Sequence, residues 1–141
     1  MKKLQAAFST VMLVDDNEID NFINQKMIEG CNFADKVYVH TTAKSALEFL
    51  KNIDRNPEFP QSLVPQVIFL DINMPMMDGF QFVAEFGKLN RETRRGVKIL
   101  LLTSSINPQD HQKSSNTYAI AKFMNKPLTK DHLASLGVSD N

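Results

Sequence analysis

The sequence predicts an α/β fold of the doubly wound kind, in which a parallel sheet carries helices on both faces. Short apolar runs alternate five times with segments of helical periodicity. The apolar runs lack polar alternation, which is typical of parallel strands buried on both sides. A chain of 141 residues suits one such domain and is short for two. We therefore expect a single domain over residues 1–141, with a core from about residue 9 to about residue 137.

Each predicted strand is followed by a predicted helix, with bounds set by apolar spacing and capping residues. The strands are residues 11–14, 36–40, 66–70, 98–103 and 120–125. The helices are a segment ending near Gly30, a segment beginning near Ala43, residues 79–89, residues 108–118 after an Asn107 cap, and residues 129–137. Residues 55–65 contain three prolines and are expected to form an irregular surface loop.

The first helix carries apolar residues at the spacing of one helical face, namely Ile19, Phe22, Ile23 and Met27. That spacing predicts a face turned toward the core. Phe22, Phe82, Phe86 and the methionines are accordingly expected to be core residues.

Composition argues against a nucleic-acid or membrane partner. Sixteen basic and sixteen acidic residues cancel, so no strong overall field attracts nucleic acid or an anionic membrane. Apolar runs such as those at residues 67–70 and 99–102 are far shorter than the ~20 residues of a membrane-spanning helix. Cys31 is the only cysteine, which suits a reducing compartment. We expect a cytoplasmic protein, as a monomer or a weak homodimer.

Polar residues follow the strands at the edge where sites form in open parallel sheets. Asp15 and Asp16 follow the first strand, and Asp71 follows the third. Thr103 ends the fourth strand, and Lys126 comes directly after the fifth. Three carboxylates, a hydroxyl and an amine are therefore expected to meet at one rim.

The charges of this predicted group restrict what it can do. Two carboxylates ~4 Å apart repel by roughly 4 kcal/mol at an effective dielectric constant near 20. Protonation or a nearby cation relieves that repulsion, and Mg²⁺ prefers a site with one or two carboxylates, waters and phosphate oxygens. The group is suited to accept a phosphoryl group on a carboxylate, with the metal and the amine neutralising charge.

Each of these residues also has a simpler explanation when taken alone. Asp15 and Asp16 could cap the following helix and interact with its dipole. Lys126 could be a solvated residue at a strand end. The joint placement of the residues at strand ends argues against these explanations.

Four segments, LVDDNE, VIFLDINMPMMDGF, LLLTSS and FMNKPL, resemble the receiver domain of two-component response regulators. The resemblance runs from about Val11 to Leu136. It implies a flavodoxin-like (βα)5 fold with the strand order 2-1-3-4-5. It also implies Mg²⁺ as a cofactor, a histidine kinase or phosphotransfer protein as the phosphodonor, and a downstream protein as the receiver of the signal.

The resemblance implies roles for the residues at the acidic rim. Asp71 would be the phosphoacceptor. Asp16 and Asp71 would bind Mg²⁺ directly, together with the backbone carbonyl of Asn73, and Asp15 would reach it through water. Lys126 would contact the phosphoryl group.

Two further residues would form the conformational switch that the resemblance implies. Thr103 would be the switch hydroxyl, and Phe123 would be the aromatic side chain that moves with it. Family members commonly have alanine after this hydroxyl residue, whereas this chain reads Thr103-Ser104-Ser105. Ser104 therefore remains an alternative to Thr103.

These observations favour a stand-alone phosphoacceptor in a two-component phosphorelay. We expect that this protein is not an enzyme, apart from catalysing its own phosphorylation and dephosphorylation. A receiver-like scaffold that acts without phosphorylation is the alternative. An aspartyl-phosphate phosphohydrolase is disfavoured, because Asn73 stands where such enzymes need an acid. A dinucleotide-binding oxidoreductase is also disfavoured, because no glycine follows the first strand.

Overall fold

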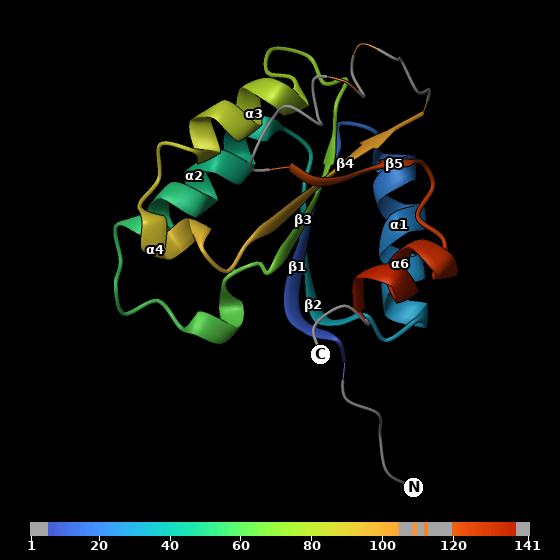
Figure 1. Cartoon of the computed structure of the whole chain (residues 1–141), viewed down its shortest axis with the longest axis horizontal. Helices are drawn as coiled ribbons and strands as arrows, with labels where there is room; N and C mark the ends of the chain where they lie inside the picture. Colours follow the sequence, from blue (N-terminus) through green and yellow to red (C-terminus); the bar gives the residue numbers. More distant parts are fainter. Residues whose placement is uncertain (1–5, 105–108, 110–111, 113–119, 138–141) are drawn as a thin grey trace, which may run out of the picture.

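Five parallel strands form one sheet with helices on both faces, which confirms the predicted fold class (Figure 1). The computed structural model describes residues 6–104, 109, 112 and 120–137. The strands are β1 (Phe8–Val14), β2 (Ala34–His40), β3 (Val67–Asp71), β4 (Lys98–Thr103) and β5 (Ile120–Asn125). Their order is β2-β1-β3-β4-β5, the order that the resemblance implied.

Helices connect the strands and divide between the two faces of the sheet. They are α1 (Glu18–Gly30), α2 (Ala43–Asp54), the 3₁₀ helix η1 (Gln61–Leu63), α3 (Gly79–Phe86), α4 (Arg91–Arg94) and α6 (Lys130–Gly137). Helices α2, α3 and α4 cover one face, and α1 and α6 cover the other (Figure 1). Each face buries its own apolar cluster, so the central strands are apolar on both sides.

The strands and most of the helices lie close to their predicted positions. β1 and β2 begin earlier than expected, and the short α4 was not predicted. The polar helix expected at residues 108–118, with its Asn107 cap, falls almost entirely outside the described residues. Within the part of the chain that is described, no helix has the length and apolar character needed to cross a bilayer.

The predicted orientation of α1 is wrong. Three of the four residues of its apolar stripe face outward, with exposed fractions of 70% at Ile19, 61% at Phe22 and 43% at Ile23. Only Met27 is half-buried against the apolar cluster on the α1 side. The residues that α1 buries are instead Asn21, Asn24 and Ile28. The expectation of a buried position therefore fails for Phe22, and also for Met76, which is fully exposed. It is confirmed for Phe82 and Phe86, and among the methionines for Met12, Met74 and Met124.

The buried asparagines explain why α1 turns its apolar stripe away from the sheet. The Asn21 side chain donates to the Asp15 carbonyl at 2.8 Å, and the Asn24 side chain accepts the Leu128 N–H at 3.0 Å. Both partners are backbone groups of loops at the carboxyl ends of strands. A buried backbone group without a hydrogen-bond partner lowers the stability of the fold by about 1–3 kcal/mol. Two amide side chains on this face of α1 therefore stabilise the fold more than apolar side chains would.

This orientation predicts opposite effects for two substitutions in α1. Replacing Asn24 by alanine leaves a buried N–H without its acceptor and should destabilise the fold by about 1–3 kcal/mol. Replacing the exposed Phe22 by alanine should change stability by no more than about 0.5 kcal/mol. Urea unfolding of the two variants measures both effects. A larger loss from Phe22→Ala than from Asn24→Ala would contradict the observed orientation.

Candidate functional site

The period of two along each strand brings distant polar residues to one side of the sheet. Leu13, Phe69 and Met124 all belong to the apolar cluster on the α1 side. Asp15, Asp71 and Lys126 each come two residues later, so they continue the same face. The three side chains meet at the carboxyl ends of β1, β3 and β5, as the sequence predicted.

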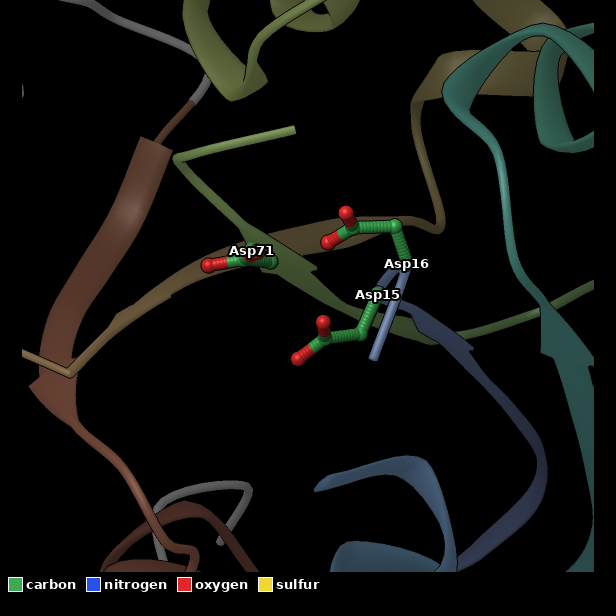
Figure 2. A group of neighbouring side chains, drawn as sticks. All are labelled: Asp15, Asp16 and Asp71. Carbon is green, nitrogen blue, oxygen red and sulfur yellow. The ribbon is translucent and has the colours of Figure 1, made fainter. Parts of the chain in front are cut away.

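Asp15, Asp16 and Asp71 form a compact acidic group. Each offers one carboxylate oxygen, and these atoms all lie within 4.8 Å of one another. Figure 2 shows the three carboxylates at the ends of their strands, gathered around a common space. Asp15 and Asp71 are buried, whereas Asp16 is exposed. Solvent thus reaches the group mainly on the side of Asp16.

The ammonium of Lys126 lies against the buried part of this group. Its Nζ atom is 2.7 Å from Asp15 Oδ2 and 3.3 Å from Asp71 Oδ1. It also lies 2.9 Å from Oδ2 of Asp20, on the first turn of α1. The sequence predicted that Lys126 would be near Asp71, but it gave no sign of Asp20. That contact depends on which face of α1 turns inward, and the apolar spacing indicated the wrong one.

The loop between β1 and α1 is held by residues that cap the helix. Asn17 is the N-cap, and its Oδ1 accepts the backbone N–H groups of Ile19 and Asp20. Oδ1 of Asp15 accepts the Asn17 N–H at 2.9 Å. The simpler explanation of Asp15 and Asp16 as the helix cap is therefore wrong, because Asn17 performs that role. Asp16 makes no capping contact in the described structure.

The turn after Asp71 is shaped by Asp78 and Gly79. Asp78 forms a capping box with Gln81 at the start of α3. The N–H of Gly79 donates to the Ile72 carbonyl at 2.9 Å. A Cβ atom at Gly79 would lie 3.1 Å from the Asp71 carbonyl oxygen and from Cα of Ile72. A larger residue would therefore push on the backbone that carries Asp71.

The hydroxyl residues at the end of β4 differ in their environment. Thr103 is fully buried, and its carbonyl accepts the Lys126 N–H at 2.7 Å, whereas Ser104 is exposed. Thr103 continues the face of Leu101, and Leu101 pairs with Phe123 across the sheet. Phe123 is half-buried against the apolar cluster on the α2 side. Thr103 and Phe123 therefore share one face of neighbouring strands.

The surroundings of Asp71 change its affinity for protons. Burial, followed by the charge of Asp15, raises the pKa of Asp71 from 3.8 to about 6, although Lys126 and the N–H of Asn73 act in the opposite direction. For Lys126, burial works against the charge. Hydrogen bonds to Asp15 and Asp20 and the charge of Asp71 outweigh burial and raise the pKa of the ammonium. In the absence of a metal, Lys126 and the N–H of Asn73 thus compensate only part of the negative charge of Asp71.

The donor set suits a hard divalent cation. Carboxylate oxygens are the ligands that Mg²⁺ and Mn²⁺ prefer in proteins, and Mg²⁺ is commonly bound by one or two of them with waters. Asp16 supplies an accessible carboxylate, and Asp71 carries charge that its surroundings disfavour. The residues present therefore fit the metal that the sequence analysis predicted.

Comparison with known proteins identifies the family. The family model of the response regulator receiver domain matches residues 11–136 of this chain. The chain belongs to this family. It is a receiver of two-component signalling, and receivers of this family act as phosphoacceptors that interact with histidine kinases or phosphotransfer proteins.

Individual relatives agree with this membership. The receiver is 25% identical over 126 residues to the sensor histidine kinase CheAY of Helicobacter pylori, covering 89% of this chain and 14% of that protein. It is 28% identical over 100 residues to the response regulator Rcp1 of Synechocystis, covering 71% of this chain and 65% of that protein. The chain therefore spans less than two thirds of the length of either relative.

Solved structures share the fold. A two-component response regulator from Cytophaga hutchinsonii superposes with a TM-score of 0.81 at 26% identity, covering 92% of this chain and 93% of that one. The Mn²⁺-bound form of Rcp1 superposes with a TM-score of 0.67 at 22% identity, covering 92% of this chain and 88% of that one.

The raised pKa of Asp71 predicts how its charge affects stability. A pKa above the ordinary 3.8 means that the fold favours the protonated carboxyl, so stability is lost as the pH rises from about 4 to about 6. Asp71→Asn should therefore stabilise the metal-free receiver by roughly 3 kcal/mol near neutral pH. The gain should disappear below about pH 4.

Urea unfolding of both proteins in a chelating buffer, at acidic and at neutral pH, measures this difference. Asp35→Asn, which removes an exposed acid distant from the group, should show no comparable dependence on pH. A loss of stability in Asp71→Asn at neutral pH would contradict the proposed charge balance.

Proposed function

We propose that this receiver accepts a phosphoryl group on Asp71 from a phosphohistidine of a histidine kinase or phosphotransfer protein. The observation that carries this proposal is the acidic group at the strand ends, with ligand atoms within 4.8 Å of one another and the Lys126 ammonium 3.3 Å from Asp71. The repulsion among these carboxylates favours a bound cation, and the Asp71 carboxylate lies beside the Lys126 ammonium. That combination favours transfer of an anionic group to Asp71.

The proposed transfer is a displacement at phosphorus by a carboxylate oxygen of Asp71. A bond forms between that oxygen and phosphorus, the P–N bond of the phosphohistidine breaks, and the released imidazole takes a proton from solvent. With a pKa of about 6, Asp71 is mostly ionised at neutral pH and able to attack. Lys126 lies close enough to Asp71 to donate to an oxygen of the transferred group.

Mg²⁺ is the cofactor of this proposal, and it would neutralise the charge of the phosphoryl oxygens and of the attacking carboxylate. Asp16 and Asp71 would bind it directly with the backbone carbonyl of Asn73, and Asp15 would bind through water. The exposure of Asp16 and the Asp15 contacts with Asn17 and Lys126 support this division. The Mn²⁺ bound by Rcp1, a relative of the same fold, supports a divalent cation.

The conformational response would pass from Asp71 to β4 and β5. We assign the switch hydroxyl to Thr103 rather than Ser104, because Thr103 is buried at the strand end. Phe123 is the proposed second part, since it lies on the same sheet face as Thr103 and is half-buried. A downstream protein would read this face.

The alternative functions have less support. In a scaffold without phosphorylation, the buried charge of Asp71 would cost stability with no benefit. In a phosphohydrolase, the residue two positions after the nucleophile must donate a proton, and here it is Asn73. An amide does not perform that role.

The exposed apolar face of α1 is the proposed docking surface for the phosphodonor. Ile19, Phe22 and Ile23 are exposed, and Asp20 in the same turn contacts Lys126. Large apolar side chains grouped on a surface mark interaction sites. A protein bound there would bring a phosphohistidine to the strand ends, where Asp71 lies.

Small phosphodonors test the acceptor directly. Incubation with acetyl phosphate and Mg²⁺ should add one phosphoryl group to the wild-type chain, detected by intact mass, and chelation of Mg²⁺ should prevent it. Asp71→Asn should abolish the addition, because its amide is a poor nucleophile. The control Asp35→Asn should react normally. Phosphorylation that persists in Asp71→Asn would refute the assignment.

The docking surface predicts a different response to protein and small donors. A variant with Ile19, Phe22 and Ile23 replaced by alanine should accept phosphate from a phosphorylated kinase about tenfold more slowly, the scale of a lost interface hot spot. Its reaction with acetyl phosphate should be unchanged. Val39→Ala, which shortens an exposed apolar residue of β2, is the control. Equal slowing with both donors would place the defect in the acidic group instead.

A further inference from the structure

The ammonium of Lys126 has three carboxylate neighbours, and these differ in their relation to the proposed metal. Asp15 and Asp71 belong to the acidic group whose ligand atoms lie within 4.8 Å of one another. Asp20, with Oδ2 2.9 Å from Nζ, is not part of that group. It comes from α1, and its side chain is 32% exposed, compared with 4% for Asp15 and 6% for Asp71.

Lys126 and a divalent cation compete for the same oxygens. The ammonium lies 2.7 Å from Asp15 and 3.3 Å from Asp71, so it neutralises two of the three carboxylates proposed to hold Mg²⁺. An ion bound among these carboxylates would repel the ammonium across a short distance in a largely buried setting. Metal binding therefore requires Lys126 to weaken its contacts with Asp15 and Asp71.

Asp20 offers Lys126 a partner that the metal does not use. An ammonium on a flexible four-carbon stem donates three hydrogen bonds and can redistribute them among neighbouring acceptors. Asn17 Oδ1 accepts the N–H of Asp20 at 3.1 Å, which fixes the first turn of α1 and with it the Asp20 carboxylate. The charge of Lys126 can thus remain paired after Asp15 and Asp71 turn to the metal.

We propose that Asp20 is a positioning residue that retains the Lys126 ammonium when the metal binds, and thereby strengthens Mg²⁺ binding. This inference rests on the metal site of the proposed function. In a variant without the Asp20 carboxylate, the Lys126 ammonium still contacts Asp15 and Asp71 as long as no metal is bound. When the metal binds and takes these two carboxylates, the ammonium has no carboxylate partner left among the three. The cost of losing Asp20 therefore falls mainly on the metal-bound state.

A double-mutant cycle on Mg²⁺ affinity tests this coupling. Calorimetric Mg²⁺ titrations would compare the wild type, Asp20→Asn, Lys126→Ala and the double variant. Asp20→Asn should weaken Mg²⁺ binding about threefold to tenfold, the range of coupling between charged neighbours. In the Lys126→Ala background the same substitution should change affinity by less than about twofold. Lys126→Ala alone should bind Mg²⁺ more tightly than the wild type.

Two further variants separate positioning from charge. Glu18→Gln removes an exposed acid in the same first turn of α1 and should leave Mg²⁺ affinity within about twofold of the wild type. Asp20→Glu keeps the charge and should restore most of the affinity lost in Asp20→Asn. Far-UV circular dichroism of each variant checks that the fold is intact.

The outcomes distinguish this inference from the proposed function. Equal weakening by Asp20→Asn with and without Lys126 would show that Asp20 acts through its charge alone, and would overturn the inference. Unchanged affinity in Asp20→Asn would overturn it as well. In both cases wild-type Mg²⁺ binding would leave the proposed metal site standing. Failure of the wild type to bind Mg²⁺ would refute the metal site and this inference together.

Discussion

Repulsion among carboxylates gathered at one end of the sheet is the constraint on which the site depends. Asp15, Asp16 and Asp71 bring their ligand atoms within 4.8 Å of one another, and two of the three are buried. The ammonium of Lys126 compensates part of this charge, yet burial and the charge of Asp15 still raise the pKa of Asp71. A group in this condition gains stability from a divalent cation, because a ligand that binds the folded state alone stabilises it by mass action. The same unrelieved charge beside the Lys126 ammonium supports the proposal that Asp71 accepts the phosphoryl group.

The rest of the fold keeps these charges together. The central strands are buried on both faces, so their ends hold the acidic residues on a rigid base. Helix α1 presents asparagines to that end of the sheet, and these bind backbone groups of the loops that carry Asp15 and Lys126. The inward face of α1 is therefore part of the site. Its apolar side chains at Ile19, Phe22 and Ile23 are consequently left in solvent, at the surface where we propose that the phosphodonor docks.

Sequence reasoning predicted the parts of the site that depend on strands and failed for the part that depends on a helix. The common edge of parallel strands was enough to bring Asp71 and Lys126 together. Apolar spacing predicted that Phe22 faces inward, but the buried position belongs to Asn24, whose partner is a backbone group far along the chain. The contact between Asp20 and Lys126 was missed for the same reason. The pairing of a polar helix face with a distant loop has no local pattern that a single sequence reveals.

The central claim is that Asp71 takes the phosphoryl group while the neighbouring acids hold a metal. A crystal structure of the receiver grown with Mg²⁺ and beryllofluoride, a mimic of the phosphoryl group, tests it most directly. We predict beryllofluoride on the Asp71 carboxylate and a cation about 2.0–2.1 Å from oxygens of Asp16 and Asp71. Lys126 should then donate to the mimic and no longer to Asp15. A metal bound elsewhere, or an unmodified Asp71 still paired with Lys126, would contradict this account.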